Sequence, residues 1–405
     1  MPRTALVLAA AVCLALPVVP DARSGPDAVA ERARQLHFSS LVVDTHDDTT
    51  QRMLSPGFDL GARHTDGHVD IPRMREGGLD ALFLSIWIDS RTQGPSAVQK
   101  ALAQIDAIRE AVRTHPKDLV LARTADEVRR AHAEQKIAVL MGVEGGHMIG
   151  NDLRMVRILG ALGVRYLTLS HFYNDEWADS STDKPVHNGL TTFGKDVVRE
   201  LNRQGILVDI SHVSDKTFAD ALEVSRAPLI ASHSSVRAIS DHVRNMSDEM
   251  IRALGAKGGV IHINYEKSYL DQAYKTAYEK AAGGVVASID AIFKDCGDDT
   301  ECVAHEIAAR ERRLTESGAV PRVSWERIVE HIDHVVKLVG PDHVGLGSDF
   351  DGANTPEGMD DCSMLPKVTE ALLRRGYQED DVQKILGGNT LRVLEAAERV
   401  SREMQ

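Results

Sequence analysis

Imidazole and carboxylate side chains follow an apolar stretch near the start of the chain. The segment LVVDTHDDTT, residues 41–50, begins as a β-prone run and then presents His46, Asp47 and Asp48. Polar groups beside a core are costly unless something compensates for their lost hydration, and a metal ion is one such compensator. Because residues i and i+2 of a strand point to the same side, His46 and Asp48 can face one ion while Asp47 points away.

Apolar, β-prone runs elsewhere in the chain end in side chains of the same chemical types. A histidine at the end of one strand is more often a structural residue than a ligand. Six ends of this kind, counting the one at His46, are far less expected by chance, and together they indicate a metal centre. The five further residues are Glu144 in LMGVEGGH, His171 in LTLSH, His212 in VDISH, His233 in LIASH and Asp349 in GLGSDFDG.

The ligand types suggest which ions are bound and how many. Imidazole and carboxylate suit zinc, without excluding manganese or cobalt. His212 and His233 come from neighbouring strands and are expected to share a second ion. Two cations about 3.5–4 Å apart need a shared anion, and Glu144, on a strand between the two groups, is predicted to bridge them. The adjacent Gly145 and Gly146 are expected to leave room for the backbone near two zinc ions per chain.

Two of the strand-end residues remain for chemistry. A strand-end carboxylate can take a proton from a metal-activated water and deliver it, and Asp349 fits this role better than Asp351, which sits in the following turn. His171 can donate a hydrogen bond to an oxyanion, with metal ligation as the alternative. We expect several other histidines to be structural or solvated, namely His64, His68, His147, His187, His242, His262 and His305.

The elements that must position these residues alternate along the chain. Amphipathic helical segments separate most of the apolar runs, which favours a parallel α/β sheet. Eight strands predict a closed (β/α)8 TIM-type barrel, whose active site lies at the C-terminal strand ends. An open doubly wound sheet is the alternative, weakened because no glycine-rich loop follows the first strand. Strands are expected near residues 41–46, 81–88, 137–143, 166–170, 206–211, 228–232, 258–264 and 343–348.

One segment breaks this alternation. Residues 266–322 are polar, helical and rich in Lys and Glu, and we interpret them as a helical insertion after strand seven. We expect it to act as a solvated support for a lid rather than to form an independent domain. Residues 25–405 are therefore predicted to form a single barrel domain.

The N-terminus has the order of a secretory signal peptide. Arg3 precedes an uncharged run from Thr4 to Pro20, and the polar segment DARSGPDA follows. We predict a signal peptide over residues 1–24, because the run is short for a membrane-spanning helix. The protein is then exported, periplasmic or secreted. Membrane attachment through an uncleaved N-terminus is the alternative.

Charge and cysteine content restrict the partners further. The formal net charge is −13 and no basic stripe is present, which argues against nucleic acid as a partner. In an oxidising compartment, Cys296 and Cys302, which flank GDDTE, are placed to close a small disulfide. Cys362 would then be unpaired or available to a second subunit, and we expect a homodimer.

In these residues the chain resembles a known family, the membrane (renal-type) dipeptidases, a branch of the amidohydrolase-like barrel enzymes. The resemblance spans roughly residues 41–395, and the Trp-Ala-Asp after His171 and the Asp-Phe-Asp-Gly are its most specific parts. The matching stretches are VVDTHDDTT, GHVDIPRMREGG, MGVEGGHMIGNDL, YLTLSHFYNDEWADSS, GLTTFGKDVVRELNRQGILVDISHVS, PLIASHSSVRAISDHVRN and HVGLGSDFDG.

The resemblance implies a binuclear zinc enzyme that hydrolyses dipeptides, with some members also opening β-lactams. It implies one ion on His46 and Asp48, a second on His212 and His233, and Glu144 as the bridge. It further implies that His171 binds the oxyanion and that Asp349 transfers protons. An arginine eleven residues after the last metal histidine, Arg244, would bind the substrate carboxylate. From its sequence alone, Arg244 would pass as a surface residue paired with Asp241 or Asp248.

Two departures from the mammalian members matter. The segment 266–322 is longer here and lies near the expected mouth, so their side-chain preference does not transfer, and their anchoring tail is absent. Two other functions remain as alternatives. One is another amidohydrolase, such as a lactonase, phosphotriesterase, deaminase or β-lactam-opening enzyme, although a carboxylated-lysine bridge would not fit Glu144. The other is a non-catalytic peptide- or metal-binding barrel, which would not need Asp349.

Overall fold

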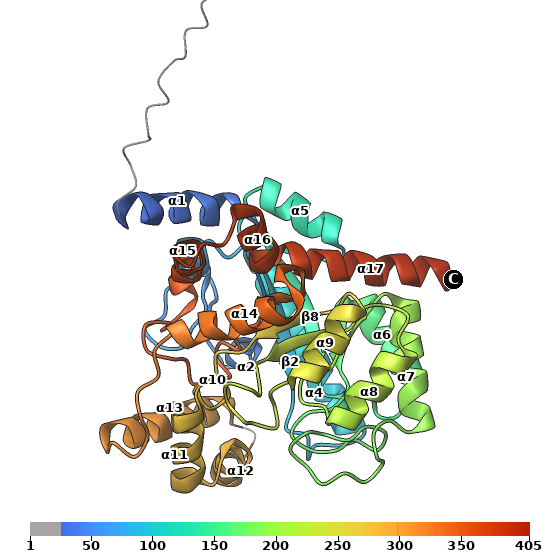
Figure 1. Ribbon diagram of the computed structural model, residues 1–405. Coiled ribbons are helices and arrows are strands. Elements are labelled where there is room, and N and C mark those ends of the chain that lie inside the picture. The colour runs from blue at the N-terminus through green and yellow to red at the C-terminus, as the bar shows by residue number, and fades with distance from the viewer. Residues whose placement is uncertain (1–25, 298) are drawn as a thin grey trace, which may run out of the picture.

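A parallel β-barrel forms the centre of the computed structural model, which describes residues 26–297 and 299–405 (Figure 1). Each strand of the barrel pairs with the next one along the chain, and the last strand pairs with the first. The eight barrel strands within the described residues are β1 (Val43–Asp47), β2 (Ala81–Trp87), β4 (Ile137–Glu144), β5 (Val164–Thr168), β6 (Leu207–Asp209), β7 (Ile230–Ser234), β8 (Val260–Ile263) and β9 (Val344–Leu346).

The predicted α/β barrel is confirmed, and each of the eight strands lies where an apolar run was expected. One additional strand, β3 (Leu119–Leu121), was not predicted. It pairs with the first residues of β4, whereas β5 pairs with β4 only from Met141 onward. Strand β3 therefore fills the edge of β4 that β5 leaves free. Three residues are too few to show a strand periodicity in the sequence.

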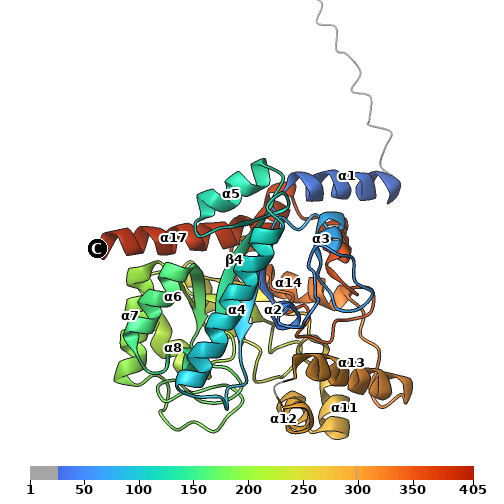
Figure 2. The same ribbon diagram turned by 180° about the vertical axis from the view of Figure 1, so that it is seen from behind.

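Helices surround the barrel and cover the outer face of the strands (Figures 1 and 2). Several of them begin at a side chain that caps the first turn, as Thr191, Ser214 and Ser247 do by accepting a backbone N–H three residues later. The covering helices are α4 (Pro95–Thr114), α5 (Ala125–Ala133), α6 (Leu153–Leu162), α7 (Thr192–Gln204), α8 (Asp215–Val224), α9 (Asp248–Ala256), α14 (Glu326–Val339), α15 (Pro366–Arg374) and α17 (Asn389–Glu403).

Shorter elements connect these helices and strands. Helix α1 (Pro26–Ser39) packs against α15 at one end of the molecule. The other short helices are α2 (Thr50–Met53), α3 (Ile71–Glu76) and α16 (Glu379–Gln383). Single turns of 3-10 or π-helix span Gly146–Ile149, Pro341–His343, Cys362–Met364 and Lys384–Gly388. Within the described residues, no helix is both long and apolar enough to cross a membrane.

The N-terminal end of the barrel is closed by apolar packing. Leu391, Leu394 and Ala397 of α17 join the same buried cluster as Val43 and Ala81, which lie at or near the starts of their strands. Helices α1, α5 and α17 lie together at this end in both views (Figures 1 and 2). This end of the barrel therefore contributes to the core and leaves the opposite end for chemistry.

A glycine on β4 lets a tyrosine enter the barrel. A Cβ atom on Gly142 would lie 1.9 Å from the ring of Tyr166, so only glycine allows this approach. The ring of Tyr166 is fully buried and lies 5.3 Å from that of Phe83. Its hydroxyl reaches Nδ1 of His46 at 2.7 Å. Packing inside the barrel thus fixes the position of a residue at the opposite end.

The insertion after β8, the seventh strand of the barrel, is helical as predicted. It contains α10 (Lys267–Leu270), α11 (Gln272–Ala282), α12 (Val285–Cys296) and α13 (Thr300–Glu316). Helices α11, α12 and α13 gather on the side of the molecule away from α1, α5 and α17 (Figures 1 and 2). Tyr274, Tyr278, Val320 and Val323 form a small core of their own, so the segment is more than a solvated support.

The cysteines follow the expectation in part. Cys296 and Cys302 form a disulfide that joins the end of α12 to the start of α13. Cys362 is a free thiol, but it is completely buried. It is therefore not available to a second subunit, and that alternative was wrong because the residue packs into the core beneath α3. The predicted signal peptide, residues 1–24, lies outside the described residues.

Candidate metal centre

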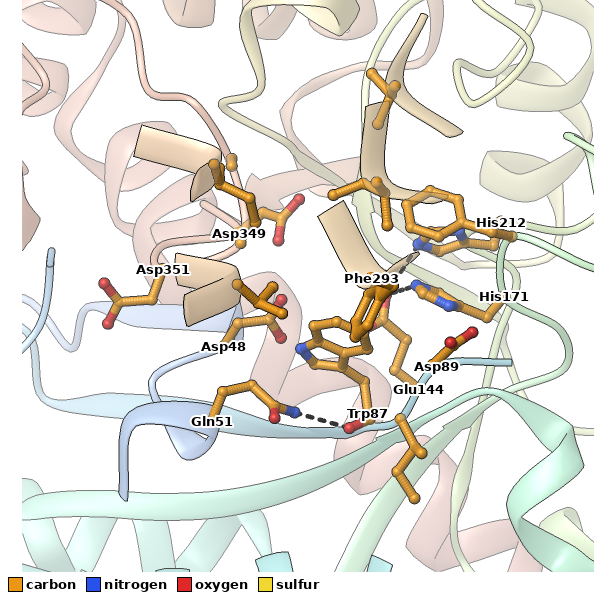
Figure 3. A pocket seen from close by; sticks show the side chains of 18 of the residues that line it. Asp48, Gln51, Trp87, Asp89, Glu144, His171, His212, Phe293, Asp349 and Asp351 are labelled. Atoms are coloured by element: carbon orange, nitrogen blue, oxygen red, sulfur yellow. Dashed lines mark hydrogen bonds and ion pairs between the residues drawn. The ribbon is translucent and has the colours of Figure 1, made fainter. Parts of the chain in front are cut away.

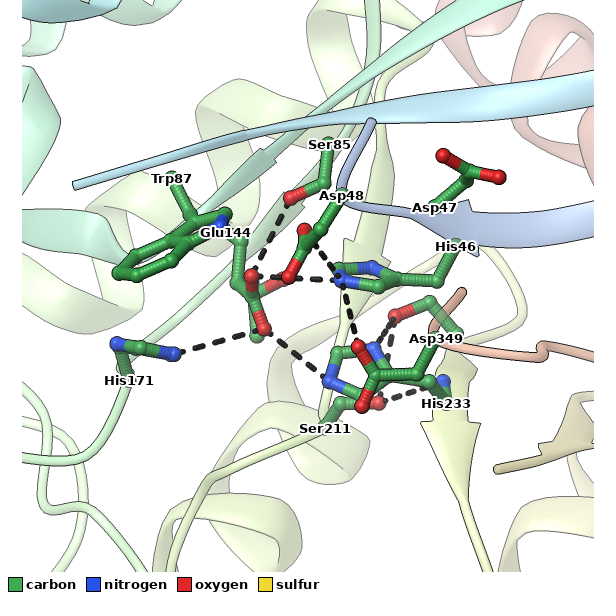
Figure 4. A network of polar contacts seen from close by, with 12 residues as sticks. His46, Asp47, Asp48, Ser85, Trp87, Glu144, His171, Ser211, His233 and Asp349 are labelled. Carbon is green, nitrogen blue, oxygen red and sulfur yellow. Dashed lines mark hydrogen bonds and ion pairs between the residues drawn. The ribbon is translucent and has the colours of Figure 1, made fainter. Parts of the chain in front are cut away.

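The strand-end residues meet at the C-terminal end of the barrel around one carboxylate, that of Glu144 (Figure 4). Its Oε1 atom lies 2.9 Å from Nε2 of His212 and 3.1 Å from Nε2 of His233. Its Oε2 atom lies 3.4 Å from Nε2 of His46. The two oxygens of Glu144 thus face different histidines, which is the arrangement that a bridging ligand requires.

The other acidic residues lie on the β1 side of this carboxylate. Nε2 of His46 is 3.4 Å from Oδ1 of Asp48 and 3.9 Å from Oδ1 of Asp349. Asp47 is buried but points away from the cluster, as expected, and its Oδ1 accepts a hydrogen bond from the backbone of Thr49 (Figure 4). The i and i+2 alternation of the strand therefore selects the two residues that face inward.

His171 approaches from the other side. Its Nε2 lies 3.7 Å from Oε1 of Glu144 (Figure 3). Its Nδ1 contacts the hydroxyl of Ser90 at 3.1 Å. In the described part of the chain, three groups bring ligand atoms within 4.8 Å of one another. These groups are His46–Glu144–His233, Glu144–His171–His212 and His46–Asp48–Asp349. His171 and Asp349 thus lie within the same cluster as the five predicted ligands.

Neighbouring hydroxyl groups orient the inner rings. Nδ1 of His233 lies 2.8 Å from the hydroxyl of Ser232, which in turn donates to Asp209 at 2.7 Å. The hydroxyl of Tyr166 holds Nδ1 of His46 in the same manner. Each ring is fixed through its Nδ1 atom, so that its Nε2 atom faces Glu144. Such outer partners are typical of histidines that bind metals.

Backbone strain is concentrated in this region. His212 has φ +68° and Asp349 has φ +62°, values that residues with a Cβ rarely adopt. Asp351, in the next turn, has φ +65°. Strain of this kind persists only where the surrounding structure enforces it, and it gathers at functional sites. The backbone turns sharply where the strand ends and aims both side chains at the cluster.

Burial lowers the pKa of three of the cluster histidines, whereas Tyr166 and Glu144 outweigh burial and raise the pKa of the fourth, His46. Burial and the charge of Arg244 hold the pKa of His212 well below its usual range, and burial together with His46 does the same to the pKa of His233. Burial also lowers the pKa of His171 to about 4. A neutral imidazole retains a lone pair on one ring nitrogen, which is the form that binds a metal ion.

The carboxylates respond differently. Burial acts to raise the pKa of Glu144, but the surrounding histidines outweigh it and hold this pKa well below its usual range. Burial and the neighbouring charge of Asp48 raise the pKa of Asp349 well above its usual range. The amide of Asn264 donates to Oδ2 of Asp349 at 2.9 Å. Glu144 therefore stays an anion, whereas Asp349 accepts a proton more readily.

Unpaired buried atoms indicate that the cluster fits a metal. Nε2 of His46 and Oδ1 of Asp48, 3.4 Å apart, are buried without a hydrogen-bond partner in the described structure. Buried polar atoms are normally paired, so their convergence on one spot needs an explanation. A divalent cation supplies one, and this set of nitrogen and oxygen donors matches zinc.

Arg244 is not a surface residue. It is buried with only 3% of its surface exposed, on the loop after β7, and Nη2 donates to the carbonyl of His233 at 3.2 Å. Its guanidinium lies 5.4 Å from the ring centre of Tyr269. Nε and Nη1 have no hydrogen-bond partner in the described structure, and Arg244 lines the main cavity. It is therefore free to hold an anion there.

A cavity of about 260 Å³ opens in front of the cluster (Figure 3). Asp48, Glu144, His171, His212 and Asp349 line its floor. Its walls include apolar side chains from β2, α12 and α13. A small peptide therefore reaches these five residues of the cluster from one side.

Some expectations about neighbouring residues need correction. Gly145 is required by its backbone, which has φ +120°, and a Cβ there would lie 2.6 Å from the ring of His147. A Cβ on Gly146 would meet Trp177 and Asp175. The space beside these glycines is thus filled by His147 and by two side chains of the loop after β5. His262 is structural as predicted, with ring contacts to Ala231 and Thr390.

Sequence reasoning missed several residues that shape the site. Tyr166 and Ser85 point into the barrel from the middle of their strands, and the hydroxyl of Ser85 donates to Glu144 at 3.2 Å. Asn264 directly follows β8, a barrel strand to which no site residue was assigned from the sequence. Its position at the strand end could have identified it as a candidate. Trp87 ends β2 in the same way. The sequence pattern around Tyr166 and Ser85 is the same as that of ordinary core residues, so it does not identify them as part of the site.

The comparisons with known proteins agree with this geometry. The model of the membrane dipeptidases (peptidase family M19) matches residues 30–405. The chain belongs to this family.

Three similar proteins illustrate the family. Dipeptidase tcpJ of Claviceps purpurea is 35% identical over 345 residues, which cover 83% of this chain and 70% of that protein. The crystal structure of the probable dipeptidase PvdM from Pseudomonas aeruginosa has 29% identity and a TM-score of 0.78, covering 93% of this chain and 100% of that one. A metallo peptidase from Rhodobacter sphaeroides, liganded with a phosphinate mimic of the dipeptide L-Ala-D-Ala, has 26% identity and a TM-score of 0.73, covering 88% and 99%.

The fold, the site and the family together define the class of enzyme. The chain is a dipeptidase of family M19 and a metallopeptidase, that is, a hydrolase acting on peptide bonds.

Proposed function

We propose that the enzyme hydrolyses dipeptides at a centre of two zinc ions bridged by Glu144. The single observation that carries this proposal is the division of the Glu144 carboxylate, whose Oε2 faces His46 while Oε1 faces His212 and His233. In this assignment His46 and Asp48 hold the first ion, and the two remaining histidines hold the second. When bound, the ions supply Lewis acidity that polarises the peptide carbonyl and lowers the pKa of a water molecule.

The chain's own residues position the substrate. Nη1 of Arg244 is unpaired and, together with the second N–H of Nη2, presents to the C-terminal carboxylate a two-pronged edge that lysine does not reproduce. A carboxylate fixed there leaves one peptide bond over the cluster, which limits the substrate to dipeptides. The dipeptide mimic named for the Rhodobacter sphaeroides relative supports this substrate class.

Two residues assist the reaction. His171, neutral and held through Ser90, donates a hydrogen bond to the oxyanion that develops on the scissile carbonyl. Asp349 takes a proton from the attacking water and passes it to the amine that leaves. Its raised pKa and its contact with Asn264 support this role, because a proton carrier must hold a proton for part of each cycle.

We further propose that the protein is exported, and that residues 1–24 are removed as a signal peptide. The disulfide between Cys296 and Cys302 supports an oxidising compartment. We propose a homodimer in solution, with no nucleic-acid partner.

Metal depletion and restoration test the proposed function. The purified enzyme should release free amino acids from Ala- and Leu-containing dipeptides, lose this activity after chelation, and regain it when two equivalents of zinc per chain are added. Activity that survives complete removal of divalent ions would overturn the proposed mechanism. Restoration to full rate by one equivalent would overturn the binuclear assignment.

A further inference from the structure

The main cavity has a charged end and an apolar end. Arg244 follows β7 and donates to the carbonyl of His233 on that strand, whereas Trp87 ends β2. In the ring of eight strands, three strands separate β2 from β7 in either direction. The two residues therefore stand on opposite sides of the mouth, and both line the cavity.

The apolar end is completed by the insertion. Val285, Ile289 and Phe293 of α12 line the cavity, and their spacing of four residues places them on one face of the helix. Val303 and Ile307 of α13 follow the same spacing and also line the cavity. These side chains face the open space before the cluster. An apolar helix face turned toward a cavity is suited to bind an apolar group.

Contacts with two loops of the barrel hold α12 over the mouth. The hydroxyl of Tyr173, after β5, donates to Asp290 at 2.5 Å, and Arg91, after β2, lies 3.6 Å from the same carboxylate. The ring of Phe293 meets that of Trp87 edge to face, with centroids 6.0 Å apart (Figure 3). The guanidinium of Arg91 also lies over the ring of Phe293, 5.7 Å from its centre. The wall is thus fixed relative to the strand ends.

The insertion also fixes α12 from behind. The hydroxyl of Tyr278 donates to that of Ser288 at 3.0 Å, and Arg310 of α13 donates to the carbonyl of Ser288 at 2.9 Å. The disulfide joins the end of α12 to α13. A pocket wall held at both faces keeps its shape when the substrate binds, which favours discrimination by size.

We propose that α12 and α13 form the pocket for the side chain of the N-terminal residue, and that the enzyme therefore prefers dipeptides with a large apolar first residue. This inference rests on the proposed function, in which Arg244 holds the C-terminal carboxylate. With the carboxylate at the β7 side and the peptide bond over Glu144, the first residue points toward Trp87 and Phe293. The second residue stays near the charged end, away from the apolar wall.

Position-specific substrates test this orientation. For the metal-loaded wild type, kcat/KM for Leu-Gly should exceed that for Gly-Gly by about tenfold or more, the usual effect of filling an apolar pocket. The kcat/KM for Gly-Leu should stay within about threefold of that for Gly-Gly, because the leucine side chain would then fill no apolar pocket. The reverse order would overturn the orientation, and equal values for all three would overturn the pocket.

Variants of α12 test the residues. Phe293→Ala and Ile289→Ala should each lower the ratio of kcat/KM for Leu-Gly over Gly-Gly by about tenfold. Lys294→Ala changes the exposed neighbour of Phe293 and should leave the ratio unaltered. Phe293→Leu replaces the alanine variant if the latter does not fold. An unchanged ratio in folded, metal-loaded variants of Phe293 and Ile289 would overturn the inference while leaving dipeptide hydrolysis intact. Failure of the wild type to cleave any dipeptide would overturn the proposed function and this inference with it.

Discussion

Glu144 is the residue on which both halves of the proposed metal centre depend. Glu144→Gln keeps the shape of the side chain but removes the charge that offsets two cations. We therefore expect metal content to fall from two ions per chain to less than one, measured by elemental analysis. Asp47→Asn is the matched control, because this buried acid lies beside the cluster and points away from it. One ion per chain in the wild type would contradict the bridge.

A variant of Asp349 distinguishes two possible roles of this residue, proton transfer and metal binding. It stands 3.9 Å from His46, close enough to be grouped with the candidate ligands. If it carries a proton, Asp349→Asn should retain both ions and lower kcat by about 10²–10⁴-fold, the usual worth of a positioned acid or base. Elemental analysis and turnover are measured on the same sample. Loss of metal from the variant would instead assign Asp349 to the ligands.

Variants of Arg244 test whether the enzyme recognises the free C-terminal carboxylate of its substrate. Arg244→Met removes a buried, charge-assisted contact and should lower kcat/KM for a free dipeptide by roughly 10- to 150-fold, corresponding to about 1.5–3 kcal/mol. The wild type should handle the C-terminally amidated dipeptide about as poorly, and the variant should no longer distinguish acid from amide. Arg252→Met, an exposed arginine on α9, is the control. Discrimination that survives in Arg244→Met would remove this arginine from the substrate site.

The sequence predicted the strand-end residues more completely than their neighbours. His46, Asp48 and Glu144 follow apolar runs, and the geometry of parallel strands brings such ends together whatever the details of packing. Tyr166 was beyond prediction, because its contact with His46 depends on the ring crossing the barrel over Gly142. The role of Arg244 was predicted from the family resemblance alone, and its burial was not predicted, since a loop residue shows no periodicity.

At the scale of elements, His331 ties α14 to both segments that frame the charged end of the cavity. Its Nδ1 accepts from the backbone N–H of Val236, at the start of the loop that carries Arg244, and its Nε2 lies 3.0 Å from the carbonyl of Leu270 in α10. The ring is fully buried, and burial lowers its pKa from 6.5 to about 4. The ring is therefore neutral in the folded protein at neutral pH.

The lowered pKa of His331 makes stability depend on pH in a defined direction. Above pH 6.5 His331 is unprotonated in both the folded and the unfolded chain, and its contribution to the stability of the fold is fully present. As pH falls toward 4, the unfolded chain takes up a proton that the folded chain refuses, so about 3 kcal/mol of stability is lost. Denaturant unfolding at several pH values should show a flatter profile for His331→Gln than for the wild type. The exposed His305 provides the control variant, His305→Gln, and equal slopes for wild type and His331→Gln would contradict this role.

Among the elements, the barrel strands were predictable and the role of the insertion was not. Eight apolar runs of sufficient length alternate with amphipathic helices, and few folds other than a parallel barrel fit that order of elements. Strand β3 was too short to be recognised. The segment 266–322 was identified as helical, but its contribution to the cavity depends on Phe293 meeting Trp87, a contact between two residues that share no local pattern.

At the scale of the whole molecule, the proposed export predicts where the mature chain begins. N-terminal sequencing of protein purified from its native source should find a start just after residue 22 to 25. In the same sample Cys296 and Cys302 should resist alkylation until a reductant is added, as their disulfide requires. An N-terminal peptide that retains residues 6–16 would favour an uncleaved anchor. Two free thiols would argue against an oxidising compartment.

The closure of the barrel has a consequence for how the protein is made. The hydroxyl of Thr45 on β1 bonds the carbonyl of Leu346 on β9, 301 residues later, and α17 completes the packing at the base. A ribosome must therefore release almost the entire chain before the first strand finds its last partner. Contacts of such long range form slowly. A nascent chain that cannot close its barrel before its final helix is synthesised remains unfolded for that time. An unfolded chain is the form that can pass through a translocation channel.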